Sequence, residues 1–174
     1  TQEWNISSIE EDGVFVGIDI GGSDIKAVVV KDMRLIHYKI VKWSPKTIND
    51  LYVSEGHVAI IEKLISDVIS EAKTKDANIP AVKAIGISVN LAVVNNRITG
   101  TGNVVAGLKD DHARAFRSLD VILNEYYGLP VFVLNDGDAA AIQTTIDMGL
   151  SYALSLAIGT GLAMGYHSTQ FLTE

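Results

Sequence analysis

The sequence contains no cysteine, which excludes disulfide bonds and thiolate metal ligands. Basic residues are also scarce: 14 lysines and arginines stand against 21 acidic residues, giving a formal net charge of −7 at pH 7. This charge argues against a nucleic-acid partner, because non-specific nucleic-acid binding relies on many cations that neutralise phosphates. The lack of cysteine fits a cytoplasmic protein, and we expect that localisation.

Long uninterrupted apolar runs are missing as well. The most apolar segment, residues 152–166, is broken by Gly159, Gly161 and Gly165 and is shorter than the roughly 20 residues that a membrane-spanning helix needs. The polar, acidic start of the chain does not resemble a signal peptide. We therefore expect no membrane partner, with a polar tail over residues 1–13 and one folded domain over residues 14–174.

The hydrophobic pattern predicts an α/β domain. Three strands in a meander come first, and strands then alternate with helices, which implies a mixed sheet covered by helices on both faces. The apolar residues of the segment 90–110 follow neither helical nor strand spacing. The predicted strands are 14–20, 25–30, 35–43, 82–89, 131–134, 152–158 and 162–167, and the predicted helices are 58–72, 114–127 and 138–148.

The turn between the first two strands combines an acid, two glycines and a base. We expect Gly21 and Gly22 to take positive φ and to bring backbone N–H groups near a ligand. The loop is not a Walker A motif, because Ser23 stands where the lysine should be. Two interpretations remain open, an ordinary hairpin turn and a phosphate-binding hairpin in which Asp19 holds Mg²⁺ through water and Lys26 assists.

Two later segments favour the phosphate interpretation. Gly159-Thr160-Gly161 is a second glycine turn between strands, and a Thr hydroxyl there suits a phosphate. Asp136 follows a short strand and precedes a helix, where it could accept a proton from a substrate hydroxyl that attacks a phosphate. The alternative role of Asp136 is a helix N-cap, although Asn135 or Asp138 could provide the cap instead.

Other candidate sites are weaker. The segment from Gly86 to Asn90 resembles a GxSxG nucleophile elbow, except that Asn90 replaces the last glycine. No later histidine and acid evidently complete a catalytic triad with Ser88. The four histidines lack metal-ligand spacing, and we expect them at the surface. Those histidines are residues 37, 57, 112 and 167.

Taken together and in order, the motifs resemble the ROK family (repressors, open reading frames and kinases) within the actin-like sugar kinases. The GGS form of the first motif and the Asn-Asp-x-Asp-Ala-Ala form of the third are similar to the polyphosphate glucokinases of that family. The segments that carry the resemblance are Asp19-Ile20-Gly21-Gly22-Ser23-Asp24-Ile25-Lys26, Gly102-Asn103-Val104, Leu134-Asn135-Asp136-Gly137-Asp138-Ala139-Ala140 and Ile158-Gly159-Thr160-Gly161.

The resemblance implies an actin-like ATPase (ribonuclease-H-like) domain with a mixed five-stranded sheet and helices on both faces. It also implies a glucokinase-like enzyme that transfers a phosphoryl group from ATP or polyphosphate to a hexose hydroxyl. In that enzyme Asp136 is the catalytic base, and Mg²⁺ bridges the phosphates near Asp19. The implied sugar ligands are Asn103, Asn135 and Asp136, and the implied phosphate ligands are Gly21, Gly22, Ser23, Lys26, Gly159, Thr160 and Gly161.

The chain also departs from the family pattern. Val89-Asn90 replaces the usual Pro-Gly, Ala163 replaces a glycine, and the expected glutamate after the alanine run is missing near Gln143. Family members continue into a second lobe with a Glu-x-Gly-His sugar motif and an adenine pocket. We therefore expect an N-terminal lobe whose second lobe is absent or truncated, and which is inactive alone.

Two other functions stay open. A non-catalytic regulator of the same family would bind sugar or nucleotide without transferring phosphate, and an actin- or chaperone-like ATPase would hydrolyse ATP without needing sugar. A homodimer is compatible with either activity.

Overall fold

The computed structural model describes residues 12–43, 56–100, 102, 104–105, 108, 110–158 and 162–169. Four predicted site residues lie outside this set, and so does most of the predicted tail. Those four residues are Asn103, Gly159, Thr160 and Gly161.

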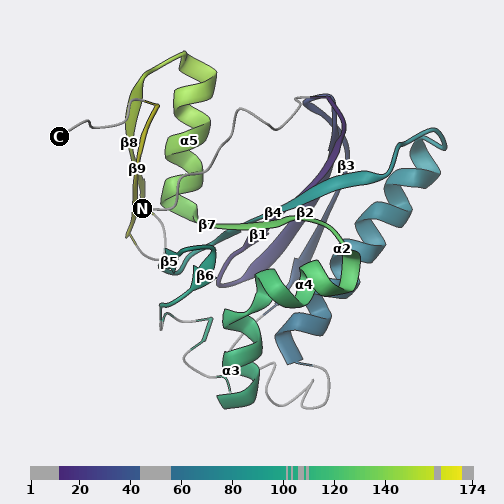
Figure 1. The fold of residues 1–174 in the computed structure, drawn as a ribbon, viewed down its shortest axis with the longest axis horizontal. Coiled ribbons are helices and arrows are strands. Elements are labelled where there is room, and N and C mark those ends of the chain that lie inside the picture. Colours follow the sequence, from purple (N-terminus) through teal and green to yellow (C-terminus); the bar gives the residue numbers. More distant parts are fainter. Residues whose placement is uncertain are drawn as a thin grey trace.

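A five-stranded sheet forms the centre of the domain (Figure 1). Its order is β3-β2-β1-β4-β7. The first three strands pair antiparallel, whereas β4 pairs parallel with both β1 and β7. The predicted mixed five-stranded sheet is therefore confirmed. The strands are β1 (Val14–Ile20), β2 (Asp24–Lys31), β3 (Arg34–Lys42), β4 (Val82–Val89) and β7 (Val131–Asn135).

Helices lie on both sides of this sheet, as predicted. In Figure 1, α2 (Gly56–Lys75), α3 (Asp110–Arg117) and α4 (Leu119–Tyr127) lie below the sheet, and α5 (Asp136–Met148) lies above it. Among the described residues, no helix is both long and apolar enough to cross a membrane.

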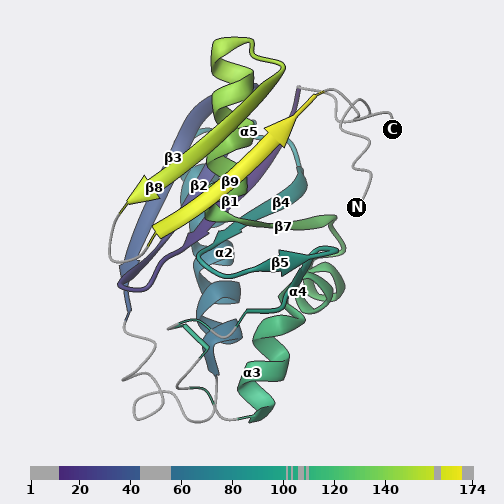
Figure 2. The ribbon, with the colours of Figure 1, turned by 90° about the vertical axis from the view of Figure 1, so that its left-hand side faces the viewer.

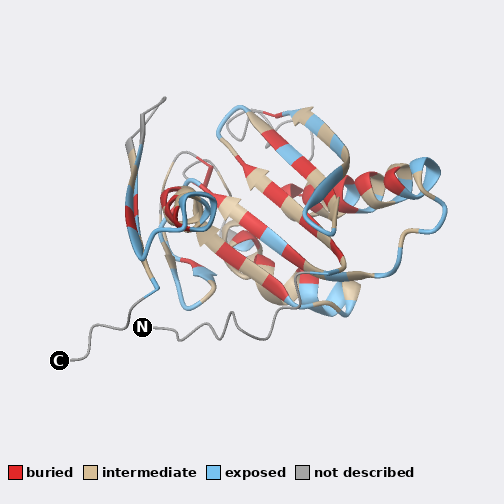
Figure 3. Cartoon of the chain, turned by 90° about the horizontal axis from the view of Figure 1, so that it is seen from above, coloured by how far each residue is buried: buried red, intermediate tan, exposed pale blue. Residues whose placement is uncertain are grey.

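The core lies between the sheet and the helices below it. Residues alternate between the two faces of each strand, and Val14, Val16, Ile18 and Ile20 of β1 are all buried on the face toward α2. Figure 3 shows the same alternation across the sheet. Each fully buried side chain of this kind contributes about 1.5–3 kcal/mol. Helix α2 completes the core with apolar residues at helical spacing, namely Ile61, Leu64, Ile65, Val68 and Ala72.

A separate two-stranded antiparallel sheet, β8 (Tyr152–Ile158) and β9 (Leu162–Ser168), packs against α5 (Figure 2). The contact is between backbones: a Cβ on Gly165 would overlap the backbone of Gly137 and Asp138, and a Cβ on Gly137 would lie 2.5 Å from the carbonyl carbon of Met164. The hairpin also has large exposed apolar side chains, namely Tyr152, Leu154, Leu156, Met164 and Tyr166.

Three details differ from the sequence prediction. The helix predicted over residues 114–127 is two helices, which meet at Ser118. The stretch without a clear period contains a short hairpin of β5 (Val93–Val94) and β6 (Arg97–Ile98). The surface location expected for His57 is wrong, because its ring is buried between Trp43 and Phe116, with centroid distances of 5.3 and 6.3 Å.

The turn of the β5–β6 hairpin is tied to β7 by one side chain. The Asn96 amide donates to the carbonyl oxygen of Val131 at 2.8 Å, and its Oδ1 accepts from the amide of Val133 at 2.6 Å. Asn95 and Asn96 both have positive φ, 51° and 64°. Asparagine tolerates this left-handed conformation better than most residues do.

We expect Asn96→Ala to destabilise the fold by about 2–3 kcal/mol. Two hydrogen bonds of about 1 kcal/mol each are lost, and alanine is less stable than asparagine at positive φ. Asn95→Ala is the matched control, because it carries the same backbone cost without those bonds, and it should lose about 1 kcal/mol. Urea unfolding followed by circular dichroism measures both. Equal losses in the two variants would contradict a stabilising role for the Asn96 side chain.

Candidate phosphate- and sugar-binding site

The predicted motifs meet at one edge of the central sheet. Strands β1, β4 and β7 run parallel, so their carboxyl ends lie side by side. Asp19 pairs in register with Ser88, and Val89 pairs with Asn135. Neighbouring strands are about 4.8 Å apart, which places the ends of β1 and β7 about 10 Å from each other. Ligands of α/β sheets bind at this kind of edge.

The loop between β1 and β2 has a fixed shape. The Gly21 amide donates to the Asp24 carbonyl oxygen at 3.0 Å, and the Trp43 indole Nε1 donates to the Gly21 carbonyl oxygen at 2.8 Å. The Trp43 amide also donates to the Ser23 carbonyl oxygen at 3.2 Å. The sequence prediction missed this role of Trp43, which sits one residue beyond the pairing of Asp24 with Lys42. A three-strand meander places the end of its third strand beside the turn between the first two, and this position was the sequence signal for the contact.

The prediction of positive φ at Gly21 and Gly22 is wrong, because neither residue adopts it. Position 21 favours glycine for a different reason: a Cβ there would lie 3.0 Å from the Asp24 carbonyl oxygen. Within the described part of the chain, the amides of Gly22 and Ser23 donate to no protein acceptor. These two N–H groups are therefore available to an anion.

Lys26 joins the carboxylates on either side of the turn. Its Nζ lies 2.9 Å from Oδ2 of Asp19 and 3.2 Å from Oδ1 of Asp24, whose other oxygen lies 3.3 Å from Lys42. The hydrogen bond to Asp19 raises the pKa of Lys26, and the hydrogen bond from Lys26 lowers the pKa of Asp24. Both shifts favour the charged forms of Lys26 and Asp24 at neutral pH. Lys26 is half-exposed, so it can also approach a phosphate.

The residues present fit a phosphate-bound Mg²⁺ near Asp19. Oδ2 of Asp19 accepts a hydrogen bond from Lys26, and Oδ1 accepts none from a described residue. Mg²⁺ is usually held by one or two carboxylates together with substrate phosphates and water, so a single aspartate suffices when a phosphate is bound. Among the described residues, no group of three histidines or acids could hold a metal unaided.

Asn135 and Asp136 occupy different positions at the start of α5. Asn135 is the N-cap: its Oδ1 accepts from the Gly137 amide at 2.9 Å, and its Nδ2 donates to the Leu91 carbonyl oxygen at 3.0 Å. Asp136 is the first helical residue, and its Oδ1 accepts from the same Gly137 amide at 2.9 Å. The cap thus falls on Asn135, and the second oxygen of Asp136 accepts no hydrogen bond from a described residue.

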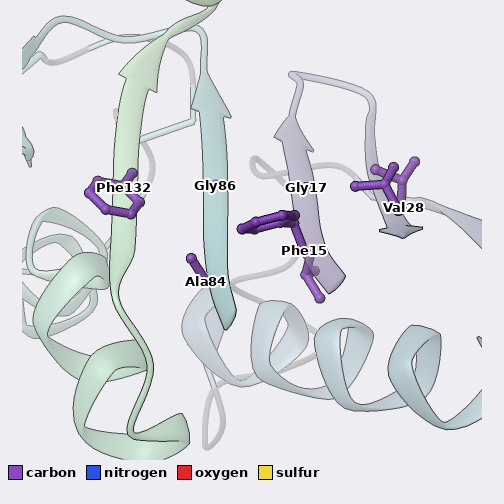
Figure 4. A pocket seen from close by; sticks show the side chains of 8 residues that line it. Phe15, Gly17, Val28, Ala84, Gly86 and Phe132 are labelled. Carbon is purple, nitrogen blue, oxygen red and sulfur yellow. The ribbon is translucent and has the colours of Figure 1, made fainter. Parts of the chain in front are cut away.

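A hollow lies further from this edge, on the sheet face opposite the core. It measures about 230 Å³, and every side chain that lines it is apolar. Gly17 and Gly86, which pair in register, leave room between the rings of Phe15 and Phe132 (Figure 4). Phosphates and sugars need polar partners, so this hollow does not fit either ligand.

The sheet order and the helices define an α/β domain with the actin-like ATPase fold. No protein-family model matches the sequence, and no curated protein sequence matches it either. Solved structures do match, and those described below are kinases of sugars.

A ROK hexokinase from Thermus thermophilus is 28% identical with a TM-score of 0.63, over 88% of this chain and 46% of that one. A ROK family glucokinase from Streptomyces griseus, in complex with glucose and AMPPNP, is 27% identical with a TM-score of 0.57, over 88% and 44%. An inorganic polyphosphate/ATP-glucomannokinase from an Arthrobacter strain is 21% identical with a TM-score of 0.63, over 89% and 58%. The predicted resemblance to ROK family sugar kinases is confirmed, and the chain spans less than half the length of the first two.

The structure brings some of the predicted site residues together. Asp19, Lys26 and the turn over residues 21–23 form one cluster at the end of β1, and Asn135 and Asp136 stand two strands away at the end of β7. The second glycine turn and the predicted sugar ligand Asn103 are outside the described residues.

Proposed function

We propose that this chain is the N-terminal lobe of a sugar kinase that transfers a phosphoryl group to a hexose hydroxyl. One observation carries the proposal: a turn with free amides at Gly22 and Ser23 and a carboxylate at Asp136 stand at the same sheet edge, after strands β1 and β7, whose ends are about 10 Å apart. The first group suits a phosphate, and the second suits the hydroxyl that attacks it.

In the proposed reaction, Asp136 accepts the proton of the sugar hydroxyl while that oxygen forms a bond to the terminal phosphorus. The bond between this phosphorus and the bridging oxygen of the donor breaks, and the leaving phosphate takes the electron pair. The amides of Gly22 and Ser23 and the ammonium of Lys26 hold the donor phosphates. A bound Mg²⁺ neutralises phosphate charge.

The remaining predicted ligands complete this proposal. Asn103 and Asn135 hold sugar hydroxyls, and the residues Gly159-Thr160-Gly161 hold phosphate as well. Asn135 already caps α5 and bonds Leu91, so its contact to sugar uses the remaining acceptor capacity of its Oδ1. The donor is ATP or polyphosphate, both of which appear in the name of one similar kinase.

Calorimetric titration of this chain tests the proposal. We expect separate binding of glucose and of ATP–Mg²⁺ or tripolyphosphate–Mg²⁺, because the sugar and phosphate groups occupy different parts of the edge. Binding of both without turnover by a longer protein that contains this chain would favour the regulator. ATP hydrolysis independent of sugar would favour an actin-like ATPase, and absence of all binding would overturn the proposal.

A further inference from the structure

The carboxyl end of β4 lies between the two predicted halves of the site and has no assigned role. Strand β4 is the neighbour of both β1 and β7. Any ligand that spans from the Gly22 turn to Asp136 must therefore pass over Ser88 and Asn90. Both residues carry polar side chains that make no hydrogen bond within the described part of the chain.

Ser88 faces the ligand side of the sheet. It pairs in register with Asp19 on one side and with Leu134 on the other, so its hydroxyl projects from the same face as the Asp19 carboxylate. Its neighbours Ile87 and Val89 are buried on the opposite, core face. Ser88 is partly exposed, so a bound ligand can reach it.

Asn90 is held in place from one side and approaches the phosphate turn on the other. The Asn135 Nδ2 donates to the carbonyl oxygens of both flanking residues, Leu91 at 3.0 Å and Val89 at 3.5 Å. A Cβ added to Gly22 would lie 3.9 Å from Nδ2 of Asn90. The exposed side-chain amide of Asn90 thus stands beside the free N–H groups of the turn. The backbone on either side of Asn90 is held by the hydrogen bonds from Asn135.

We infer that Asn90 and Ser88 form the third side of the phosphate site, and that the Asn90 amide and the Ser88 hydroxyl donate hydrogen bonds to the phosphate oxygens nearest the transferred group. This inference rests on the proposed function. The shared ligand chemistry is a chain of phosphates with Mg²⁺, whether it comes from ATP or from polyphosphate. Asn90 contacts the phosphates and not a base, so both donors depend on it equally.

The test titrates the 174-residue chain with tripolyphosphate–Mg²⁺ and, in a second arm, with ATP–Mg²⁺. We expect Asn90→Ala to lower the affinity for both phosphate ligands about tenfold, because it removes a hydrogen bond to a charged group. Ser88→Ala should lose affinity in the same direction, and Asn90→Asp should lose more because it places a negative charge beside the anion. Glucose affinity should not change in any of them.

Asn78→Ala is the matched control. Asn78 is also exposed, but it precedes the amino end of β4, and its hydrogen bond to Asp76 uses the backbone amide. Its phosphate affinity should equal that of the wild type. In nitrogen-15 NMR spectra, the side-chain NH₂ of Asn90 should shift on titration together with the amides of Gly22 and Ser23, while the NH₂ of Asn78 stays still.

The outcomes separate the two proposals. If Asn90→Ala, Ser88→Ala and Asn78→Ala all bound the phosphate ligands as tightly as the wild type, the proposed role of β4 would be overturned. The kinase proposal would still stand. Loss in the ATP arm alone would overturn the contact to phosphate, because it would place Asn90 near the base. Absence of any phosphate binding by the wild type would overturn both.

Discussion

Asp136→Asn should lower kcat for phosphoryl transfer to hexose about 10²–10⁴-fold in the complete kinase that we propose. Asparagine has nearly the same shape as aspartate but cannot accept the proton of the attacking hydroxyl. Because Asp136 does not provide the N-cap, the fold should survive the change. Steady-state kinetics with glucose and ATP–Mg²⁺ measures the loss, and KM for the donor should change little.

Asp138→Asn is the control for charge at the same helix end. Asp136 and Asp138 both lie in the first turn of α5, so each replacement removes one favourable interaction with the helix dipole, typically 0.3–1 kcal/mol. The two variants should therefore have similar stability, and only the first should lose activity. Comparable activity in both would refute Asp136 as the base.

Gly165→Ala should detach the β8–β9 hairpin from α5 and destabilise the chain by about 3 kcal/mol or more. The added methyl group would overlap the backbone of Gly137 and Asp138, and a backbone cannot move aside as a flexible side chain can. Urea unfolding measures the loss of stability. Hydrogen exchange should show faster exchange of the β8 and β9 amides than in the wild type.

Gly86→Ala separates this steric effect from the general consequence of adding a methyl group to a strand. Gly86 lies in β4, and a Cβ there would meet no atom within 4 Å. We expect unchanged or slightly higher stability, because alanine restricts the unfolded chain. If Gly165→Ala were equally harmless, the close packing of α5 on β9 would be disproved.

The central sheet was predictable because its information is local. Short apolar runs mark β1, which glycines bound, and β4, which lies between Pro80 and Asn90. The mixed order follows from a three-strand meander followed by alternating strands and helices. The break at Ser118 was not predictable, since apolar spacing continues through it. The β5–β6 hairpin was also missed, because its strands contain two residues each and its Asn95-Asn96 turn has no glycine.

The site was predictable as a set of motifs but not as a geometry. The sequence indicates that Asp19 lies at the end of a strand and that Gly22 and Asp136 follow strands, and parallel pairing then brings them to one edge. The position of Asn90 beside Gly22 depends on the cap formed by Asn135, which reaches across to the end of β4. Such contacts, between residues 44 and 46 positions apart, have no signature in either segment alone.

The hydrogen bonds of Asn96 have a further consequence for how separate molecules behave. Strand β7 is at the edge of the five-stranded sheet, and an edge strand offers unpaired backbone groups to strands of other molecules. Asn96 occupies the carbonyl of Val131 and the amide of Val133, the groups that an incoming strand would use. One side chain on a neighbouring turn therefore blocks two of the backbone groups through which the β7 edge could pair with a strand of another molecule.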